Sequence, residues 1–418
     1  MILIAEYGHI LIILACMFGF FVAWGLGAND VANAMATSVG SRALTIRQAL
    51  MIAVVFEFAG AYLAGGEVTS TISKGMIDAS MISPDLLVLG MLASMLATGI
   101  WLLLASLKGW PVSTTHTIVG AIVGFAAVGV GVDSVHWGKI GGIALSWVLS
   151  PALAGIIAFM LFRSVQMFIL SADDPFAKAQ KLVPFYMFYA GFFVSLLIML
   201  KGLKHVGVDL EAWQSIAIAV LIATAVALFG KFLLTRVKPS SDEKASRFAD
   251  VERVFAVLMI FSACAMAFAH GSNDVSNAVG PLAAIVGVVG SGKIAAQTAV
   301  PSWVLLLGAV GLVTGLVTLG YKVIATIGKK ITELTPSRGF AAELAASSTV
   351  VMASAFGIPL STTHALVGAI LGVGMARGIG AIDLRVVGSI FATWIITLPA
   401  GATLSIIFFF MFKGMFAG

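Results

Sequence analysis

Long apolar segments separated by short polar connections fill almost the whole chain. Most of them run unbroken for well over the roughly ten residues of an alternating outer-membrane β-strand, so they predict membrane helices. The predicted segments lie near residues 10–28, 48–65, 86–107, 114–132, 140–162, 183–200, 212–235, 251–270, 281–290, 296–320, 341–356, 362–376 and 386–412.

Two motifs occur twice along the chain. The segment Gly27-Ala-Asn-Asp-Val-Ala-Asn-Ala returns as Gly271-Ser-Asn-Asp-Val-Ser-Asn-Ala, with six of eight positions identical. The segment at 111–124, which begins Pro111-Val-Ser-Thr-Thr-His, returns at 359–372 as Pro359-Leu-Ser-Thr-Thr-His, with ten of fourteen positions identical. The shifts of 244 and 248 residues indicate two copies of one unit.

The repeats divide the chain into three parts. We predict a first repeat over 1–170, with core motifs at 27–34 and 111–124, and a second over 251–418, with core motifs at 271–278 and 359–372. Between them, 171–250 should hold connecting helices and a short linker at 236–250. The linker has an excess of Lys and Arg, which predicts a cytoplasmic location.

Composition narrows the class of protein. Apolar residues make up 60% of the 418 residues and charged residues only 10%, too few for a water-facing surface of this size. About a dozen spans of roughly 20 residues fit this length. Cys16 and Cys264 both lie in apolar segments, so neither a disulfide framework nor a cysteine metal site is expected. The net charge of +5 is explained by loop residues and calls for no nucleic-acid partner.

An Asp and an Asn stand at the end of an apolar segment in each repeat. Asp30 and Asn33 are three residues apart, which places them on one helix face, and Asp274 and Asn277 repeat the spacing. An aspartate in lipid is costly unless it faces a cavity, a cation or a partner. Carboxylate, amide and main-chain oxygens are ligands for small cations, and Gly25 and Gly27 are expected to unwind the helix and free carbonyls. The alternative is that each Asp caps a helix.

The Pro-x-Ser-Thr-Thr-His motifs have the signature of a helix start. Each start presents unpaired backbone N–H groups, which together with three hydroxyls favour an anion. The alternative is a pair of capped, buried helices. No cationic side chain lies in either motif, so two aspartates and a phosphate of about one to two negative charges would repel one another. About two to three bound cations would cancel that charge, so cation-coupled symport is expected.

Several other ionisable residues lie in or near apolar segments. Glu57 and Glu343 are candidates for transport-related acids, although Glu343 could also contact a helix dipole. His116 and His364 are expected to support the helix starts, and a metal site that combines them with the aspartates is disfavoured. His270 has no counterpart in the first repeat, where Leu26 stands, and is expected to have a local role.

These motifs resemble the inorganic phosphate transporter (PiT) family of sodium- or proton-coupled phosphate symporters. The resemblance extends to Phe56-Glu57, Ser41-Arg42-Ala-Leu-Thr and Arg338-Gly-Phe-Ala-Ala-Glu343-Leu, and covers roughly residues 20–408. It implies an all-α polytopic membrane protein of about 10–12 transmembrane segments, built as two inverted repeats with re-entrant helical hairpins. It also implies a homodimer. A short linker stands where animal members have a large cytoplasmic domain, which indicates a prokaryotic form in the cell (inner) membrane.

The resemblance also implies roles for individual residues. It implies that phosphate is held by Ser113, Thr114, Thr115, Ser361, Thr362 and Thr363. It implies sodium near Ala28, Asn29, Asp30, Asn33, Ser272, Asn273, Asp274 and Asn277, transport-related acids at Glu57 and Glu343, and support from His116, His364 and Arg338. No enzymatic cofactor is expected, and sodium is the only expected metal.

Sodium-coupled phosphate symport by alternating access is therefore the function we expect, with no enzymatic activity. Proton-coupled phosphate or metal–phosphate symport remains an alternative. A passive anion channel and an intramembrane metallohydrolase are less favoured, because the repeated acids would oppose anion flow and the chain has no HExxH motif or cysteine pair.

Overall fold

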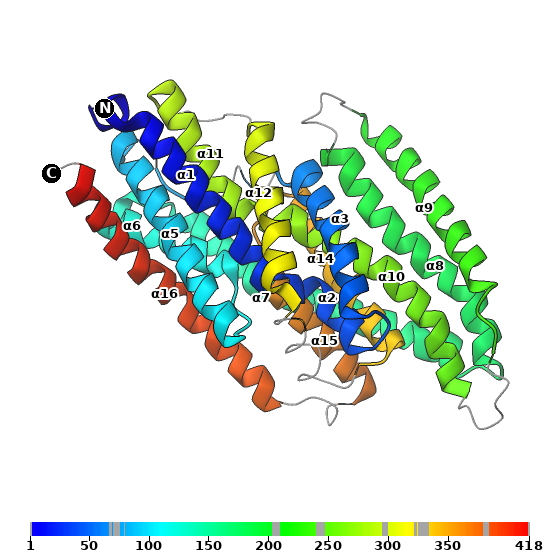
Figure 1. Cartoon of the computed structure of the whole chain (residues 1–418). Helices are drawn as coiled ribbons and strands as arrows, with labels where there is room; N and C mark the ends of the chain where they lie inside the picture. Colours follow the sequence, from blue (N-terminus) through cyan, green and yellow to red (C-terminus); the bar gives the residue numbers. More distant parts are fainter. Residues whose placement is uncertain are drawn as a thin grey trace.

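The computed structural model is a bundle of long helices (Figure 1). It describes residues 2–66, 69, 76–78, 80–202, 210–239, 247–294, 300–321, 324, 334–378 and 384–416. Within these ranges no strand forms, and a single bridge joins Ile77 and Val135. The expected all-helical fold is therefore confirmed. The predicted linker lies partly outside the described residues.

Seven helices lie in the described residues of the first predicted part, which ends at residue 170. They are α1 (Ile2–Asn29), α2 (Val31–Gly40), α3 (Ile46–Ala64), α5 (Pro84–Lys108), α6 (Thr114–Gly129), the short η1 (Val132–Ser134) and α7 (Trp137–Val165), which a π-helical turn η2 (Gln166–Leu170) extends. Two peripheral helices follow: α8 (Pro175–Leu197), extended by η3 (Ile198–Gly202), and α9 (Ala212–Leu234).

The second repeat contains a matching series of helices. They are α10 (Arg247–Asp274), α11 (Ser276–Ser291), α12 (Ser302–Gly315) with the π-helical turn η5 (Leu316–Gly320), α14 (Pro336–Ala355), α15 (Thr362–Arg377) and α16 (Leu384–Phe416). Proline at the first position of α5 and α14 fits a helix start, because the missing N–H would have no intrahelical partner there.

Corresponding helices of the two repeats pack reciprocally. Helix α1 packs against α12 and α10 against α3, while α16 packs against α6 and α7 against α15. Such exchange of equivalent contacts is the pattern of a two-fold relation between two copies. The two repeats therefore pack against each other through equivalent helices.

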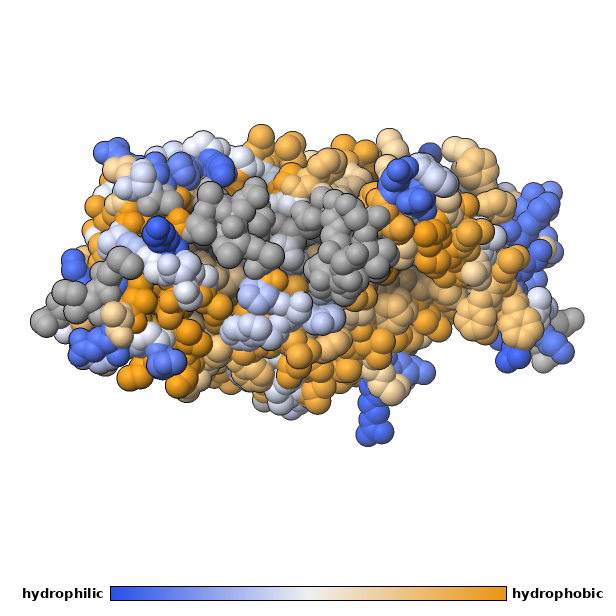
Figure 2. Space-filling view, turned by 90° about the horizontal axis from the view of Figure 1, so that it is seen from above, coloured by the Kyte–Doolittle hydropathy of each residue, from blue (hydrophilic) through white to orange (hydrophobic). Residues whose placement is uncertain are grey.

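Nine helical stretches of the described part are long and apolar enough to cross a membrane. The number falls below the expected ten to twelve because α1 and α2, and likewise α10 and α11, form continuous stretches, and α6 is shorter. Figure 2 shows apolar residues over much of the face seen from above, with hydrophilic residues in separate clusters. Large apolar side chains such as Leu221 and Ile395 are 69% and 74% exposed, as expected for a surface against lipid.

Glycines hold the reciprocal helix pairs close together. A Cβ on Gly27 would collide with the main-chain carbonyl of Leu312, and one on Gly271 would collide with that of Glu57. Helix α1 continues through Gly25 and Gly27 without interruption, so the expected unwinding there is wrong. These glycines permit close contact between backbones, the common use of small residues between membrane helices.

This packing gives a first prediction. Gly27→Ala should destabilise the protein by about 1–3 kcal/mol, because α1 and α12 must move apart to admit the methyl group. Gly141→Ala, at a helical position with no atom within 4 Å of the added Cβ, is the matched control and should be neutral or stabilising. Thermal unfolding in detergent measures both. Equal midpoints for the two variants would show that the close contact is not required.

Candidate functional site

The two Asn-Asp motifs occupy helix interruptions near the interface between the repeats. Asp30 separates α1 from α2, and Asp274 ends α10 immediately before α11. Both side chains are 2% exposed. Asp30 precedes α2 but its side chain makes no capping hydrogen bond, and Val275, not Asp274, occupies the cap of α11. Capping therefore does not explain either aspartate.

Each aspartate accepts a hydrogen bond from the helix start of its own repeat. The Thr114 hydroxyl donates to Asp30 Oδ2 at 2.5 Å, and the Thr362 hydroxyl donates to Asp274 Oδ2 at 2.7 Å. All four side chains are almost fully buried. A hydrogen bond to a charged group contributes about 1.5–3 kcal/mol, so each threonine holds its carboxylate firmly in place.

The asparagines make the opposite connection, to the helix start of the other repeat. Asn33 Nδ2 donates to Thr363 Oγ1 at 2.7 Å, and Asn277 Nδ2 donates to Thr115 Oγ1 at 3.3 Å. Each helix interruption is thus bonded to both helix starts. The sequence predicted both motifs, but it could not predict this crossed pairing.

Asn29 and Asn273 fix the two interruptions to the ends of α5 and α14, the helices that precede the two helix starts. Asn29 Nδ2 donates to Ser106 Oγ at 3.2 Å and to the Trp110 carbonyl at 3.1 Å. Asn273 Nδ2 makes the matching bonds to Ser354 Oγ at 3.1 Å and to the Ile358 carbonyl at 3.3 Å. These asparagines therefore position the motif, and their side-chain N–H groups face protein acceptors.

Helices α6 and α15 begin at the predicted motifs, and the two starts lie side by side. Ser113 and Ser361 cap them by accepting from the amides of His116 and His364, each at 3.3 Å. The Thr115 hydroxyl donates to the Leu360 carbonyl at 3.0 Å, which joins one start to the other. The amides of the first two residues in each helix have no intrahelical acceptor, so these four N–H groups suit an anion.

Fewer hydroxyls of the two helix starts are free to donate to an anion than the sequence predicted. The protons of Thr114, Thr115 and Thr362 are directed to protein acceptors. Each capping serine uses a lone pair for its capping bond and keeps its proton available. Thr363 accepts from Asn33 and likewise keeps its proton, so the helix-start amides and the hydroxyls of Ser113, Ser361 and Thr363 are the donors best placed for an oxyanion.

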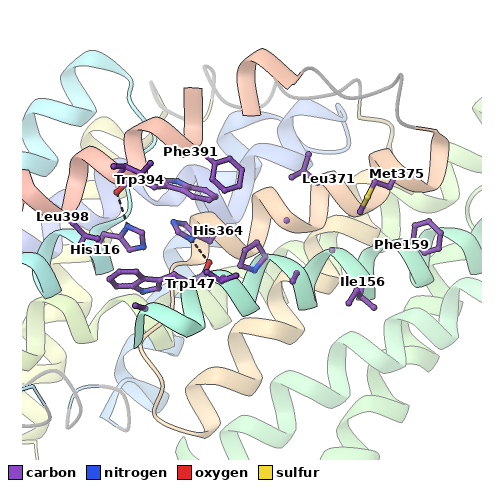
Figure 3. A pocket seen from close by; sticks show the side chains of 17 residues that line it. His116, Trp147, Ile156, Phe159, His364, Leu371, Met375, Phe391, Trp394 and Leu398 are labelled. Atoms are coloured by element: carbon purple, nitrogen blue, oxygen red, sulfur yellow. Dashed lines mark hydrogen bonds between the residues drawn. The ribbon is translucent and has the colours of Figure 1, made fainter. Parts of the chain in front are cut away.

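The ring of His116 lies against that of Trp147 in α7, and the ring of His364 lies against that of Trp394 in α16 (Figure 3). His116 Nδ1 lies 3.4 Å from the Trp394 carbonyl, and His364 Nδ1 lies 3.1 Å from the Trp147 carbonyl. The two imidazole centroids are 4.5 Å apart, and the His364 ring is stacked on Trp394 at 3.4 Å. These contacts fit the expected supporting role.

Unpaired oxygens remain beside the aspartates. Asp30 Oδ1, Asp274 Oδ1 and Asn277 Oδ1 are buried without a hydrogen-bond partner. Buried acceptors are normally satisfied, so such atoms call for a cation or a donor. Within the described residues, one ligand atom each from Asp30, His270 and Asp274 lie within 4.8 Å of one another, a group able to hold a cation.

His270 has a larger part in this site than its sequence position indicated. Its Nε2 lies 2.9 Å from Asp274 Oδ2 and its Nδ1 lies 3.2 Å from Glu57 Oε1, and all three residues are buried. Both ring nitrogens thus face carboxylates at ion-pair distance, an arrangement that suits a doubly protonated ring. Neither contact has the geometry of a hydrogen bond. The contact with Glu57 takes His270 beyond its own helix, which the comparison of the two repeats did not predict.

This ionic cluster has no equivalent in the other half. Gly271 packs on Glu57 as Gly27 packs on Leu312, so Glu57 and Leu312 occupy corresponding positions. His270 corresponds to Leu26, and both leucines are fully buried. The otherwise matched site is therefore polar and ionic on the α3–α10 side and apolar on the α1–α12 side.

Glu343 lies in a second buried polar cluster. It accepts hydrogen bonds from Thr37, from Ser38 at 2.5 Å and from Ser262 at 2.7 Å. It stands two turns inside α14, so the suggested contact with a helix dipole is wrong. Its hydroxyl partners come from α2 and α10, the helices that meet at the site.

Three other predicted residues remain, Ala28, Ser272 and Arg338. Ala28 is fully buried beside the α12–η5 junction, and the Ser272 hydroxyl lies 2.8 Å from the Ala269 carbonyl and 3.4 Å from Ser354 Oγ, which also accepts from Asn273. Arg338 lies in the first turn of α14, next to Ser337, whose amide and hydroxyl both donate to Glu252. Any role of Ala28 in cation binding would need main-chain atoms.

The duplicated helix interruptions, paired helix starts and apolar exterior define a polytopic membrane transporter with its site between two repeats. Comparison with known proteins gives the family. Residues 26–405 match the model of the phosphate transporter family. The chain belongs to that family, which consists of transporters, so it is not an enzyme.

Individual relatives agree with this assignment. The chain is 50% identical to a "putative phosphate permease" of Haemophilus influenzae over 99% of both chains. It is 43% identical to "inorganic phosphate transporter 2-1, chloroplastic" of Arabidopsis thaliana, over 95% of this chain and 71% of the relative. A solved structure described as "the sodium-dependent phosphate transporter" superposes with a TM-score of 0.91 at 38% identity, over 97% of this chain and 99% of that one.

Proposed function

We propose that the protein is a sodium-coupled symporter of inorganic phosphate that works by alternating access of its two repeats. The observation that carries the proposal is the convergence of Asp30 and Asp274, each held by a threonine of a helix start that is suited to an anion. Sodium coupling is further supported by the similar structure of a sodium-dependent phosphate transporter.

In this proposal, cation and anion sites share side chains. Oxygens of Asp30, Asn33, Asp274 and Asn277 bind sodium, and the starts of α6 and α15 bind phosphate. Thr114 and Thr362 join the two kinds of site, because their hydroxyls bind the carboxylates while their amides point out of the helices. About two to three sodium ions would balance the charge of two aspartates and one phosphate. We also infer a homodimer in the cell (inner) membrane from the family resemblance.

Proton-coupled phosphate or metal–phosphate symport is the second candidate. The observation that favours it is His270, whose imidazole joins Asp30 and Asp274 in the group of cation ligands. Imidazole binds protons and divalent transition metals but is a poor ligand for sodium.

Uptake of labelled phosphate into proteoliposomes distinguishes these candidates. We expect accumulation above equilibrium with an inward sodium gradient, and no accumulation with an inward proton gradient or with neither. Accumulation that needs a proton gradient, or added divalent metal, would establish the second candidate. Phosphate that only equilibrates would contradict coupled transport altogether.

A further inference from the structure

An apolar groove lies on the lipid side of the two helix starts. It has a volume of about 860 Å³, and its walls come from α7, α15 and α16, together with His116 of α6 (Figure 3). The rim residues Val148, Ile156 and Ile395 are 67%, 54% and 74% exposed. The groove therefore opens sideways, where the surrounding bilayer would lie.

Two of the rings at the inner end of the groove, those of His116 and His364, belong to the starts of α6 and α15. Figure 3 shows His116, His364, Trp147 and Trp394 gathered at one end, with Phe159 and Met375 at the other. The His116 and Trp147 centroids are 3.8 Å apart, and the two histidines are 4.5 Å apart. Each histidine lies in the first turn of its helix, so an occupant of the groove would contact the helix starts directly.

The groove is long enough for one acyl chain of a single leaflet. Along α7 the lining residues run from Ala144 to Phe159, about 22 Å of helix. Half of the hydrocarbon core of a bilayer is about 15 Å thick. An apolar groove that begins beside the helix starts and exceeds this half-thickness has room for an extended alkyl chain.

Basic residues lie at the outer end. Gly368 packs on the backbone of Pro151, and Gly372 packs on that of Gly155, so α7 and α15 run in the same direction along the groove. Arg163 near the end of α7 and Arg377 in the last turn of α15 therefore lie at the same end. Arg163 is exposed. Gln180 of α8 donates to the Leu234 and Val237 carbonyls, which places the α7–α8 connection on the side of the basic linker, the predicted cytoplasmic face.

We propose that this groove binds one acyl chain of an anionic phospholipid from the cytoplasmic leaflet, with the headgroup phosphate near Arg163. Basic pockets between membrane helices on this face recognise anionic headgroups. The tail would pack against the rings of His116 and His364, so bound lipid would stabilise the two helix starts in their paired arrangement.

Native mass spectrometry of the full-length, delipidated protein tests the proposal with added phosphatidylglycerol and, separately, phosphatidylcholine. We expect at least one phosphatidylglycerol to remain bound preferentially. Ala152→Phe, which fills the groove, should remove that adduct, whereas Ala217→Phe on the exposed face of α9 should retain it. Arg163→Gln should weaken phosphatidylglycerol binding about fivefold and leave phosphatidylcholine unaffected.

Three outcomes would overturn the proposal. Ala152→Phe could retain the same phosphatidylglycerol adduct, or free inorganic phosphate could displace the lipid completely, which would identify a simple anion site at Arg163. Alternatively, Ala152→Phe could convert a dimer to a monomer without changing lipid binding, which would make the groove an interface between two copies. Because lipid binding is measured without transport, these outcomes are independent of the proposed symport.

Discussion

Asp30→Asn and Asp274→Asn should each reduce sodium-driven phosphate uptake by about a hundredfold or more, since removing one partner of a buried ion pair costs about 3–5 kcal/mol. Asparagine keeps an oxygen that can accept the Thr114 or Thr362 hydroxyl, so the helix interruption should persist. What it removes is the negative charge that holds a cation beside the helix starts.

Purified variants reconstituted at equal density test this expectation. Asp173→Asn, in the exposed connection before α8, is the matched control and should transport like the wild type. Unfolding in detergent should show similar stability for Asp30→Asn and Asp173→Asn, whereas Asp274→Asn should also lose stability because its carboxylate faces the buried His270. Full sodium-driven uptake by both site variants would remove the aspartates from the cation site.

Glu57→Leu and His270→Leu should each destabilise the protein by about 3–5 kcal/mol, because each leaves part of a buried ionic cluster without its partner. The double variant should recover part of that loss, although Asp274 then lacks its contact with His270, as Asp30 lacks one in the other half. It would place two leucines at the positions that correspond to Leu26 and Leu312, a pair that the other half of the molecule already buries. Replacement of a complete buried pair by apolar residues is often nearly neutral.

A double-mutant cycle of unfolding free energies measures this coupling. Additive losses would mean that Glu57 and His270 act independently. A matched pair, Leu26→Ala and Leu312→Ala, tests the apolar counterpart, in which each loss should be about 2–5 kcal/mol from the cavity alone. The double variant of Glu57 and His270 could recover its free energy of unfolding but lose phosphate uptake. That result would show that the ion pair contributes to transport more than to folding.

The sequence predicted the helices well, together with the positions of their interruptions and starts. The apolar segments correspond to the observed helices, and the duplicated motifs fall at helix interruptions and helix starts. This worked because an apolar run long enough to span lipid must be helical, and because Asp, Ser and Pro mark positions where a helix ends or begins.

The contacts between distant residues could not be predicted in the same way. Asn33 donates a hydrogen bond to the helix start of the opposite repeat, not to that of its own. The local sequence around Asn33 is equally compatible with either hydrogen bond. His270 stood out only as a difference between repeats, and its partner Glu57 lies on another helix. Gly27 was interpreted as a point of unwinding because glycine permits both flexible backbone and close packing, which only the neighbouring helix distinguishes.

Equilibrium binding of labelled phosphate to the purified protein, with sodium or with choline at equal ionic strength, tests the central claim most directly. The claim is that cations at Asp30 and Asp274 make the adjacent helix starts able to hold the anion. Sodium should then tighten phosphate binding by about tenfold or more, and phosphate should tighten sodium binding by the same factor. Asp30→Asn and Asp274→Asn should remove this dependence. Phosphate binding of equal strength in choline and in sodium would contradict the account.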